Sequence, residues 1–391
     1  MKEFQQSDAL ARLPEQFFAK LVKKLYTYQQ QGHDLINLGQ GNPDQPTPDH
    51  IVKSLQKAAE NPVNHKYSPF QGFDHLKEAV ATYYKREYNV DVDPSTEVAL
   101  LFGSKAGLVE LSQCFLNEGD VALVPDPGYP DYWSGVALAN GVMEPLPLLE
   151  ENGFLPNYDM LDQETLQKAK LMFLNYPNNP TSAVANESFF KETIALAEQE
   201  DICVVHDFAY GAIGFDGDKP LSFLQVPGAK NVGVEIYTMS KTYNMAGWRI
   251  AFAVGNPSVV KALELIQDHY YVSLFGAVQD AAATALLDSQ QCVEDLKETY
   301  EKRRNLLVTG LQEAGYEITP CKGSFFMWLK VPDGYTSESF ADELLDKVGL
   351  FVAPGVGFGE YGEFYVRIGL NNSEEHLREA VHRFKRFKKD Q

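Results

Sequence analysis

The sequence predicts an α/β protein with a large domain, built on a mostly parallel sheet flanked by helices, and a smaller α+β domain. Three observations support this prediction. The chain has 391 residues, more than a single hydrophobic core usually organises. Short apolar runs alternate with helix-length segments through its middle, which is the pattern of βαβ units. Longer helical patterns with only two further strands follow, and they indicate a second domain of another kind.

Six apolar runs in the middle of the chain predict buried parallel strands, at residues 98–102, 121–124, 171–174, 202–205, 234–239 and 250–254. In a parallel sheet the carboxyl ends of the strands meet at one edge, where ligands bind. Five of these runs lead into a polar motif, so we expect the motifs to converge on one site. In chain order they are GSKAG (103–107), PDPGYP (125–130), NYPNNPT (175–181), HDFAY (206–210) and SKTYNMAGWR (240–249).

The two ends of the chain predict the smaller domain. Towards the C-terminus we expect a helix over 286–311, a strand at 324–330, a helix near 337–348 and a strand at 364–370. A last helix follows Ser373, a suitable N-cap. Near the N-terminus Phe17, Phe18, Leu21 and Leu25 have helical spacing, and this helix should pack on the small domain. The expected boundaries are 46–280 for the large domain, and 1–45 with 281–391 for the small one.

Composition excludes several classes of partner. The chain has 34 basic and 54 acidic side chains, a net charge of −20, which disfavours nucleic acid and anionic membranes as partners. Its four cysteines form no Cys-x-x-Cys pair, so neither a metal site nor a disulfide framework is expected. The first residues lack the apolar core of a signal peptide, and no apolar run is long enough to span a bilayer. We therefore expect a cytoplasmic protein.

Lys241 is the strongest candidate for chemistry. It lies between Ser240 and Thr242 and eight residues before Arg249, at the end of an apolar strand. A neighbouring guanidinium and exclusion from water should lower its pKa, which would make the neutral amine available as a nucleophile. Such an amine can form a Schiff base with an aldehyde cofactor. An isolated lysine is more often a solvated surface residue, but the motifs around this one favour the chemical interpretation.

The ordered set of motifs resembles that of class I pyridoxal-phosphate-dependent aminotransferases, along essentially the whole chain. The resemblance implies an aspartate-aminotransferase-like fold with a seven-stranded sheet, and pyridoxal 5'-phosphate as cofactor. It also implies that Lys241 holds the cofactor covalently and that Arg249 pairs with its phosphate. Further phosphate ligands would be Ser104, the N–H of Lys105, Thr238 and Ser240. Tyr67 would reach the phosphate of the neighbouring subunit, which makes a homodimer the active unit.

The same resemblance places four side chains around the cofactor ring. A carboxylate at Asp207 would keep the pyridine nitrogen protonated, although an isolated Asp at a strand end could equally cap a helix. Tyr210 and Asn179 would bond the phenolic oxygen, and Tyr129 would stack on the ring. His206 precedes Asp207, so strand alternation should turn it to the opposite face of the sheet.

Arg367 lies in an otherwise apolar strand, where an unpaired charge is costly, so it requires an anion. By resemblance that anion is the substrate's α-carboxylate, with Asn179 and the N–H of Gly41 completing the site. An internal salt bridge is the alternative. The glycine-rich segment 355–359 follows no βαβ start, so we interpret it as a loop beside the substrate rather than a dinucleotide site.

These residues predict a ping-pong aminotransferase. Within the family the chain looks most like methionine-salvage aminotransferases, which implies glutamine as donor and 4-methylthio-2-oxobutanoate as acceptor, giving methionine. No second basic residue is evident for a side-chain carboxylate, and aromatic residues could line an apolar pocket or belong to the core: Phe17, Phe18, Tyr270, Tyr271 and Phe275. Alternatives are a broad-range aspartate, alanine or aromatic aminotransferase and a carbon–sulfur lyase. A non-enzymatic sensor domain is disfavoured by the acidic chain.

Overall fold

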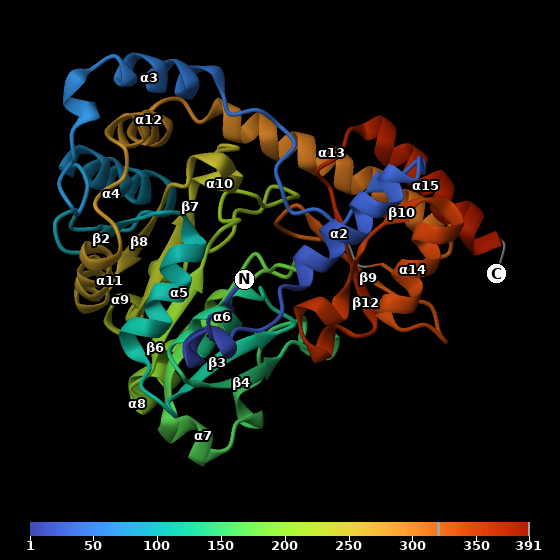
Figure 1. Cartoon of the computed structure of the whole chain (residues 1–391), viewed down its shortest axis with the longest axis horizontal. Helices are drawn as coiled ribbons and strands as arrows, with labels where there is room; N and C mark the ends of the chain where they lie inside the picture. The colour runs from blue at the N-terminus through green and yellow to red at the C-terminus, as the bar shows by residue number, and fades with distance from the viewer. Residues whose placement is uncertain (319–320, 390–391) are drawn as a thin grey trace.

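The structure is a computed structural model that describes residues 1–318 and 321–389. Figure 1 shows a large body organised around one sheet and a smaller body beside it, built from both ends of the chain. The large sheet has seven strands in the order β2-β8-β7-β6-β5-β3-β4. Their bounds are β2 Val98–Leu101, β3 Val121–Asp126, β4 Val142–Pro147, β5 Ala169–Leu174, β6 Cys203–Asp207, β7 Gly233–Thr238 and β8 Ala251–Gly255.

Strand direction corrects one prediction. β3, β5, β6 and β7 are parallel as expected, but β8, predicted as a parallel strand at 250–254, is antiparallel to both β7 and β2. An apolar run reveals burial and not direction, so the sequence could not distinguish the two cases. The sequence also missed β4, an edge strand that is exposed at its start and contains Pro145 and Pro147.

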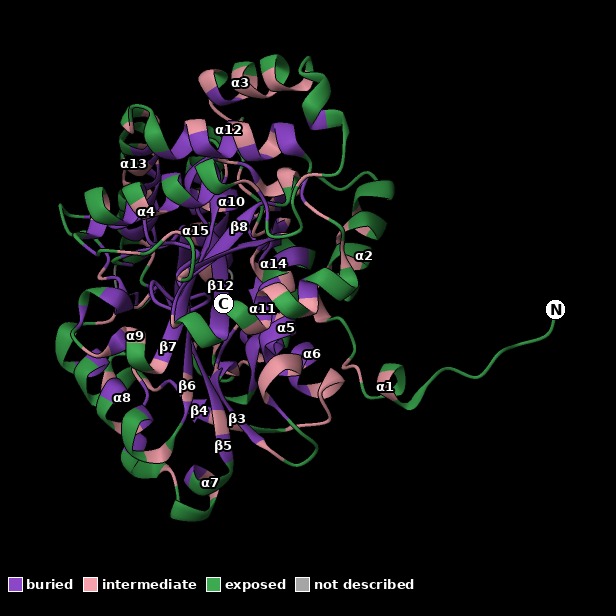
Figure 2. Cartoon of the chain, turned by 90° about the vertical axis from the view of Figure 1, so that its left-hand side faces the viewer, coloured by how far each residue is buried: buried purple, intermediate pink, exposed green. Residues whose placement is uncertain are grey.

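Helices cover both faces of the large sheet because its strands are apolar on both sides. Along β2, Val98 and Leu100 join one hydrophobic cluster, whereas Ala99 and Leu101 join the other. Figure 2 shows these buried strands between helices whose outer surfaces are exposed. The helices of the first face include α3 (Asp49–Ala59), α4 (Asp74–Tyr88), α8 (Glu187–Glu200) and α12 (Gly276–Leu287). Those of the second are α5 (Ser104–Phe115), α6 (Asp131–Leu138) and α11 (Pro257–Tyr270).

The small body has its own hydrophobic core. A three-stranded antiparallel sheet runs in the order β11-β12-β9, and a two-stranded parallel sheet joins β1 to β10. Their bounds are β1 Ile36–Asn37, β9 Phe326–Lys330, β10 Leu350–Phe351, β11 Ala353–Pro354 and β12 Tyr365–Gly369. The helices are α13 (Gln291–Glu313), α14 (Ser337–Val348) and α15 (Glu374–Lys389), close to the predicted ranges. The Ser373 hydroxyl accepts the N–H of His376, as expected of an N-cap.

The N-terminal helix α2 (Phe17–Gln30) lies on the small body, as its pattern predicted. The Tyr28 hydroxyl donates to Asp346 on α14 at 2.6 Å, and Lys24 forms an ion pair with Asp342 on the same helix. The proposed boundary at 280/281 falls within α12, which packs against α3 and α4 of the large body. The remaining short helices are α1 (Asp8–Ala11), α7 (Gln163–Lys168), α9 (Ala229–Val232) and α10 (Met239–Thr242).

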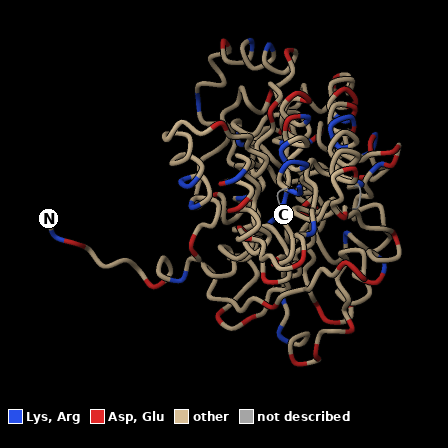
Figure 3. The backbone as a smooth tube through the Cα atoms, turned by 90° about the vertical axis from the view of Figure 1, so that its right-hand side faces the viewer, with Lys and Arg blue, Asp and Glu red and all other residues tan. Residues whose placement is uncertain are grey.

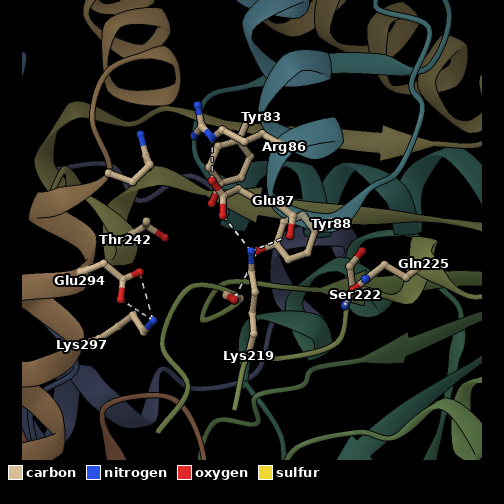
Figure 4. Close-up of polar contacts among 12 residues, drawn as sticks. Tyr83, Arg86, Glu87, Tyr88, Lys219, Ser222, Gln225, Thr242, Glu294 and Lys297 are labelled. Carbon is tan, nitrogen blue, oxygen red and sulfur yellow. Dashed lines mark hydrogen bonds and ion pairs between the residues drawn. The ribbon is translucent and has the colours of Figure 1, made fainter. Parts of the chain in front are cut away.

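Polar contacts fix the segment that follows the HDFAY motif. Lys219 Nζ donates to the carbonyl oxygen of Glu87 at 2.6 Å and to its carboxylate at 2.8 Å, at the end of α4 (Figure 4). The same ammonium lies 4.7 Å from the centre of the Tyr88 ring. The chain between β6 and β7 is therefore tied to the end of α4 in the large body.

Lys and Arg residues are interspersed with Asp and Glu residues along the described chain (Figure 3). None of the described helices is long and apolar enough to cross a membrane. Within residues 1–318 and 321–389, no group of three or more His, Cys, Asp or Glu side chains is arranged to hold a metal ion.

Candidate active site

A cavity of about 470 Å³ lies where the carboxyl ends of the large sheet face the small body. It is lined by twelve of the thirteen predicted site residues: Gly41, Ser104, Lys105, Tyr129, Asn179, Asp207, Tyr210, Thr238, Ser240, Lys241, Arg249 and Arg367. The exception is Tyr67, whose side chain is 85% exposed on the surface of the large body. The polar motifs that follow five separate strands therefore meet in one place, as the parallel-sheet argument predicted.

Asp207 ends β6 with one oxygen satisfied and one free. Its Oδ2 accepts a hydrogen bond from the Tyr132 hydroxyl at 2.9 Å, whereas its buried Oδ1 has no partner among the described residues. Burial raises the pKa of Asp207 to about 6, against the opposing effects of the Tyr132 hydrogen bond and the charge of His206. Leaving a buried carboxylate oxygen without a hydrogen-bond donor is costly, so this position is suited to a ligand group that donates a hydrogen bond.

Lys241 follows β7 within the short helix α10, and its Nζ donates to the carbonyl oxygen of Gly41 at 2.9 Å. Burial lowers the pKa of Lys241 to about 8, and the positive charge of Arg367 lowers it further. Arg249, the neighbouring guanidinium named from the sequence, lowers the pKa of Lys241 less than Arg367 does. The amine is therefore neutral in a useful fraction of molecules near physiological pH.

The start of α5 and Arg249 lie together at one end of the cavity, in an arrangement suited to an anion. Gly103 precedes α5 with φ +89°, and an added Cβ there would lie 2.1 Å from Arg249 Nη2. Glycine therefore allows the guanidinium to approach the free N–H groups of the helix. The Ser240 and Thr238 hydroxyls lie 3.0 Å apart beside it. Lys105 turns its ammonium to Asp131, at 2.8 Å, which leaves its backbone N–H for the cavity.

Arg367 lies at the other end of the cavity and is only 2% exposed. It donates to Asn179 Oδ1 at 2.9 Å and to the carbonyl oxygen of Gly39 at 2.8 Å, while its Nε has no partner within the described residues. No carboxylate of the described chain bonds to it, so the internal salt bridge considered above does not form there. Burial lowers its pKa to about 10. A buried guanidinium bonded only to neutral oxygens is suited to an incoming carboxylate.

Aromatic and amide side chains connect these two ends. Tyr129 and Tyr210 line the cavity between them, and burial raises the pKa of each phenol above its usual value. Asn175 Nδ2 donates to the backbone carbonyl of Asp207 at 2.7 Å, and its Oδ1 accepts the N–H of Asn179 at 2.7 Å. Asn175 thus fixes the relative positions of the Asp207 and Asn179 motifs.

An apolar stripe of α2 forms the remaining wall. Its residues Phe18, Leu21, Val22 and Leu25 all line the cavity at spacings of three and four, which place them on one helix face. Of the aromatic residues suggested for this wall, only Phe18 lines it. Phe17 packs against Gly357, whereas Tyr270 and Tyr271 line a separate surface hollow next to Lys105.

Sequence reasoning missed the roles of Tyr132 and Asn175. Tyr132 follows the PDPGYP motif and Asn175 opens NYPNNPT, so both lie in or beside motifs that the sequence had singled out. Their contacts with Asp207 depend on the packing of β3, β5 and β6. The expectation for His206 is confirmed. It points away from the cavity, with Nδ1 at 2.8 Å from the buried Glu235 carboxylate and its ring against Phe190 and Phe223.

This α/β topology, with a cavity between the two bodies that is lined by a buried lysine and two arginines, is that of an aspartate-aminotransferase-like enzyme. The chain belongs to the class I and II aminotransferases, whose sequence pattern it matches over residues 33–384. It is 61% identical to the L-glutamine–4-(methylsulfanyl)-2-oxobutanoate aminotransferase of Bacillus subtilis strain 168, over 97% of this chain and 96% of that protein.

Solved structures agree with this assignment. The apo form of BacF from Bacillus subtilis superposes with a TM-score of 0.95 at 48% identity, covering 99% of each chain. A single mutant of Thermus thermophilus aspartate aminotransferase superposes with a TM-score of 0.91 at 30% identity, covering 98% of this chain and 100% of that one. The predicted fold class and the predicted family are both confirmed.

Proposed function

We propose that the chain is a pyridoxal-phosphate-dependent, ping-pong aminotransferase that transfers the amino group of glutamine to 4-methylthio-2-oxobutanoate, giving methionine. The observation that carries the chemistry is the single cavity that Lys241, Asp207, Arg249 and Arg367 line together. The 61% identity to a glutamine–4-(methylsulfanyl)-2-oxobutanoate aminotransferase supports the choice of substrates.

The residues present fit the cofactor. Asp207 Oδ1 is a buried acceptor without a donor in the described chain, which suits the ring N–H. The Arg249 guanidinium, which Gly103 allows to lie close to the start of α5, suits a phosphate. Ser104, the N–H of Lys105, Thr238 and Ser240 would add phosphate ligands, while Tyr129, Asn179 and Tyr210 would hold the ring. When bound, pyridoxal phosphate withdraws electrons from the substrate's α-carbon and carries the amino group between the half-reactions.

The chain's own residues bind the substrate and move its proton. Arg367 would take the α-carboxylate in the two-pronged geometry of guanidinium–carboxylate pairs, helped by Asn179 and the N–H of Gly41. This fixes the α-carbon relative to Lys241, whose lowered pKa makes its neutral amine a suitable base for the α-proton. Tyr132 holds the second oxygen of Asp207 and so keeps that carboxylate in place.

The lining favours substrates with uncharged side chains. The cations that line the cavity in the described chain are Lys105, Lys241, Arg249 and Arg367, and each already has a partner or a proposed role. The α2 stripe offers an apolar surface that suits a thioether. A dicarboxylate-specific enzyme would require another cation, so the broad-range alternative is less favoured. A carbon–sulfur lyase would use the same cofactor residues, and its products distinguish it.

We further propose a homodimer with shared sites in the cytoplasm. Tyr67 and Phe70 are 85% and 60% exposed and lie on one loop, which is unusual for large aromatic side chains in a monomer. A partner subunit that covers this loop would explain why both side chains are exposed in the single chain. By resemblance, the Tyr67 hydroxyl would bind the phosphate of the cofactor held by that partner subunit.

The proposal is tested by the absorbance spectrum of the purified protein with pyridoxal phosphate, before and after addition of glutamine or methionine alone. We expect the spectrum to change to that of pyridoxamine phosphate, with stoichiometric release of the 2-oxo acid. Lys241→Ala should retain the cofactor non-covalently and lose turnover by several orders of magnitude. Substantial turnover in that variant, or ammonia and a thiol released from cysteine-type substrates, would contradict the proposal.

A further inference from the structure

Two sequence motifs, one in each body, contact each other, and the proposed chemistry uses only some of their residues. PDPGYP (125–130) supplies Tyr129 to the cavity, and the glycine-rich segment 355–359 forms a short 3-10 helix in the small body. The N–H of Gly128 donates to the carbonyl oxygen of Phe358 at 2.7 Å. The end of β3 is thereby joined directly to a loop that lies beside the substrate site.

Asp126, the last residue of β3, adds two hydrogen bonds to this contact. Its Oδ2 accepts the N–H of Glu360 and its Oδ1 the N–H of Tyr361, both at 3.1 Å. No basic side chain of the described residues pairs with it. Burial raises its pKa to about 6, although the two N–H bonds act in the opposite direction. Two backbone amides of the small body are thus the groups that hold this carboxylate in place.

Gly359 makes the approach of the carboxylate possible. It has φ +136°, and an added Cβ would lie 2.0 Å from Asp126 Oδ1. Backbone in that region favours glycine, and the contact leaves no room for a side chain. The shape of the loop and the position of Asp126 therefore depend on each other.

The loop that Asp126 holds carries Phe358, which packs on both substrate-side walls. Its ring centre lies 4.7 Å from the Arg367 guanidinium carbon and 5.5 Å from the ring centre of Phe18. At the other end of the contact, Tyr129 follows Asp126 by three residues and lines the cavity. The contact consequently connects the Tyr129 side of the cavity with the Arg367 side.

We propose that Asp126 is a positioning residue. With the N–H groups of Glu360 and Tyr361 it forms an interdomain latch that sets the distance between the Tyr129 and Arg367 sides of the site. Its kinetic consequence rests on the proposed function, whereas the contact itself does not. Loss of the latch should separate Arg367 from the reacting centre without removing any group that holds the cofactor.

The test compares Asp126→Asn with the wild-type chain. The asparagine has nearly the same size, but its single carbonyl oxygen can accept only one of the two N–H groups well. Losing one hydrogen bond to a charged acceptor should raise KM for both the amino acid and the oxo acid roughly tenfold or more. We expect kcat to change less and cofactor affinity to stay within about twofold, because Asp126 lies outside the proposed cofactor ligands.

A second measurement needs neither cofactor nor turnover. Hydrogen exchange at the amides of Glu360 and Tyr361 should accelerate roughly tenfold or more in Asp126→Asn. Gly359→Ala should reproduce both effects. Gly334→Ala is the matched control, since Gly334 belongs to the small body and has φ +90° but no atom within 4 Å of an added Cβ.

Unchanged amide exchange in Asp126→Asn would overturn the latch whatever the reaction. Accelerated exchange with unchanged KM would overturn its positioning role. A parallel loss of kcat, cofactor affinity and Tm, or the same effects in Gly334→Ala, would overturn the proposal in favour of general destabilisation. If the wild-type chain did not transaminate, the proposed function would fail, and amide exchange would still decide whether the latch exists.

Discussion

At the scale of single residues, burial brings the ionisation of Asp207 close to neutral pH. Its pKa is raised to about 6 by burial, above an unfolded value of about 4. The folded chain therefore binds an extra proton between these values, so this contribution to stability is present below about pH 4 and is lost as the pH rises through about 6. We expect the free energy of unfolding of the cofactor-free chain to fall over this window.

Asp207→Asn should reduce that fall by roughly 2–3 kcal/mol, as the pKa shift requires. Urea denaturation of the cofactor-free protein at a series of pH values from 4 to 7 measures the effect. Asp159→Asn, at an exposed site, is the control. An identical pH slope in wild type and Asp207→Asn would contradict the assignment.

Lys241 provides the complementary residue-scale prediction. Its pKa is lowered to about 8 by burial and by Arg367, so its share of stability grows as the pH rises from about 8 towards the unfolded value of about 10.5. After reductive methylation with labelled formaldehyde, its methyl resonance should titrate near pH 8. Arg367→Gln removes a positive charge and should raise that midpoint. A midpoint near 10.5 in the wild-type chain would exclude an activated amine.

At the scale of elements, α2 makes contacts with different roles on two faces. Its Lys24 and Tyr28 bind α14, whereas its apolar stripe faces the cavity and none of its residues is fully buried. Because that apolar surface remains open, its residues can gain burial from a substrate side chain. Leu21 and Leu25 are already partly buried, so burial of the rest of each side chain stabilises the complex by on the order of 1–2 kcal/mol.

Leu21→Ala and Leu25→Ala should therefore raise KM for 4-methylthio-2-oxobutanoate by about 5- to 30-fold. Pyruvate has no long side chain and should be affected much less. Steady-state kinetics with both oxo acids measure the ratio. Tyr26→Ala is the control on the same helix, because Tyr26 is 60% exposed and does not line the cavity. If both oxo acids were affected equally, the side chain of 4-methylthio-2-oxobutanoate would not bind against the α2 stripe.

At the scale of the whole molecule, the predicted homodimer makes a specific claim about Tyr67. If its hydroxyl reaches the neighbouring phosphate, Tyr67→Phe should weaken cofactor binding by roughly 5- to 10-fold without dissociating the dimer. Mixed dimers of Tyr67→Phe and Lys241→Ala provide the test. The site that keeps Lys241 would receive Tyr67 from its partner, so these dimers should recover cofactor affinity and turnover in half of their sites.

If the mixed dimers bound the cofactor as weakly as the Tyr67→Phe homodimer does, Tyr67 would act within its own chain. Sedimentation of the wild-type protein supplies the oligomeric state directly, and a monomer at micromolar concentration would exclude shared sites.

The sequence by itself determined the family, the position of the lysine and the convergence of five motifs. This was possible because each motif is local and the carboxyl ends of parallel strands necessarily meet at one edge. Only the tertiary structure decided that β8 is antiparallel, that Tyr132 and Asn175 hold Asp207, and that Asp126 bonds to the loop at Glu360. These contacts join segments up to 234 residues apart. Such pairings depend on how elements pack, and short sequence patterns do not record packing.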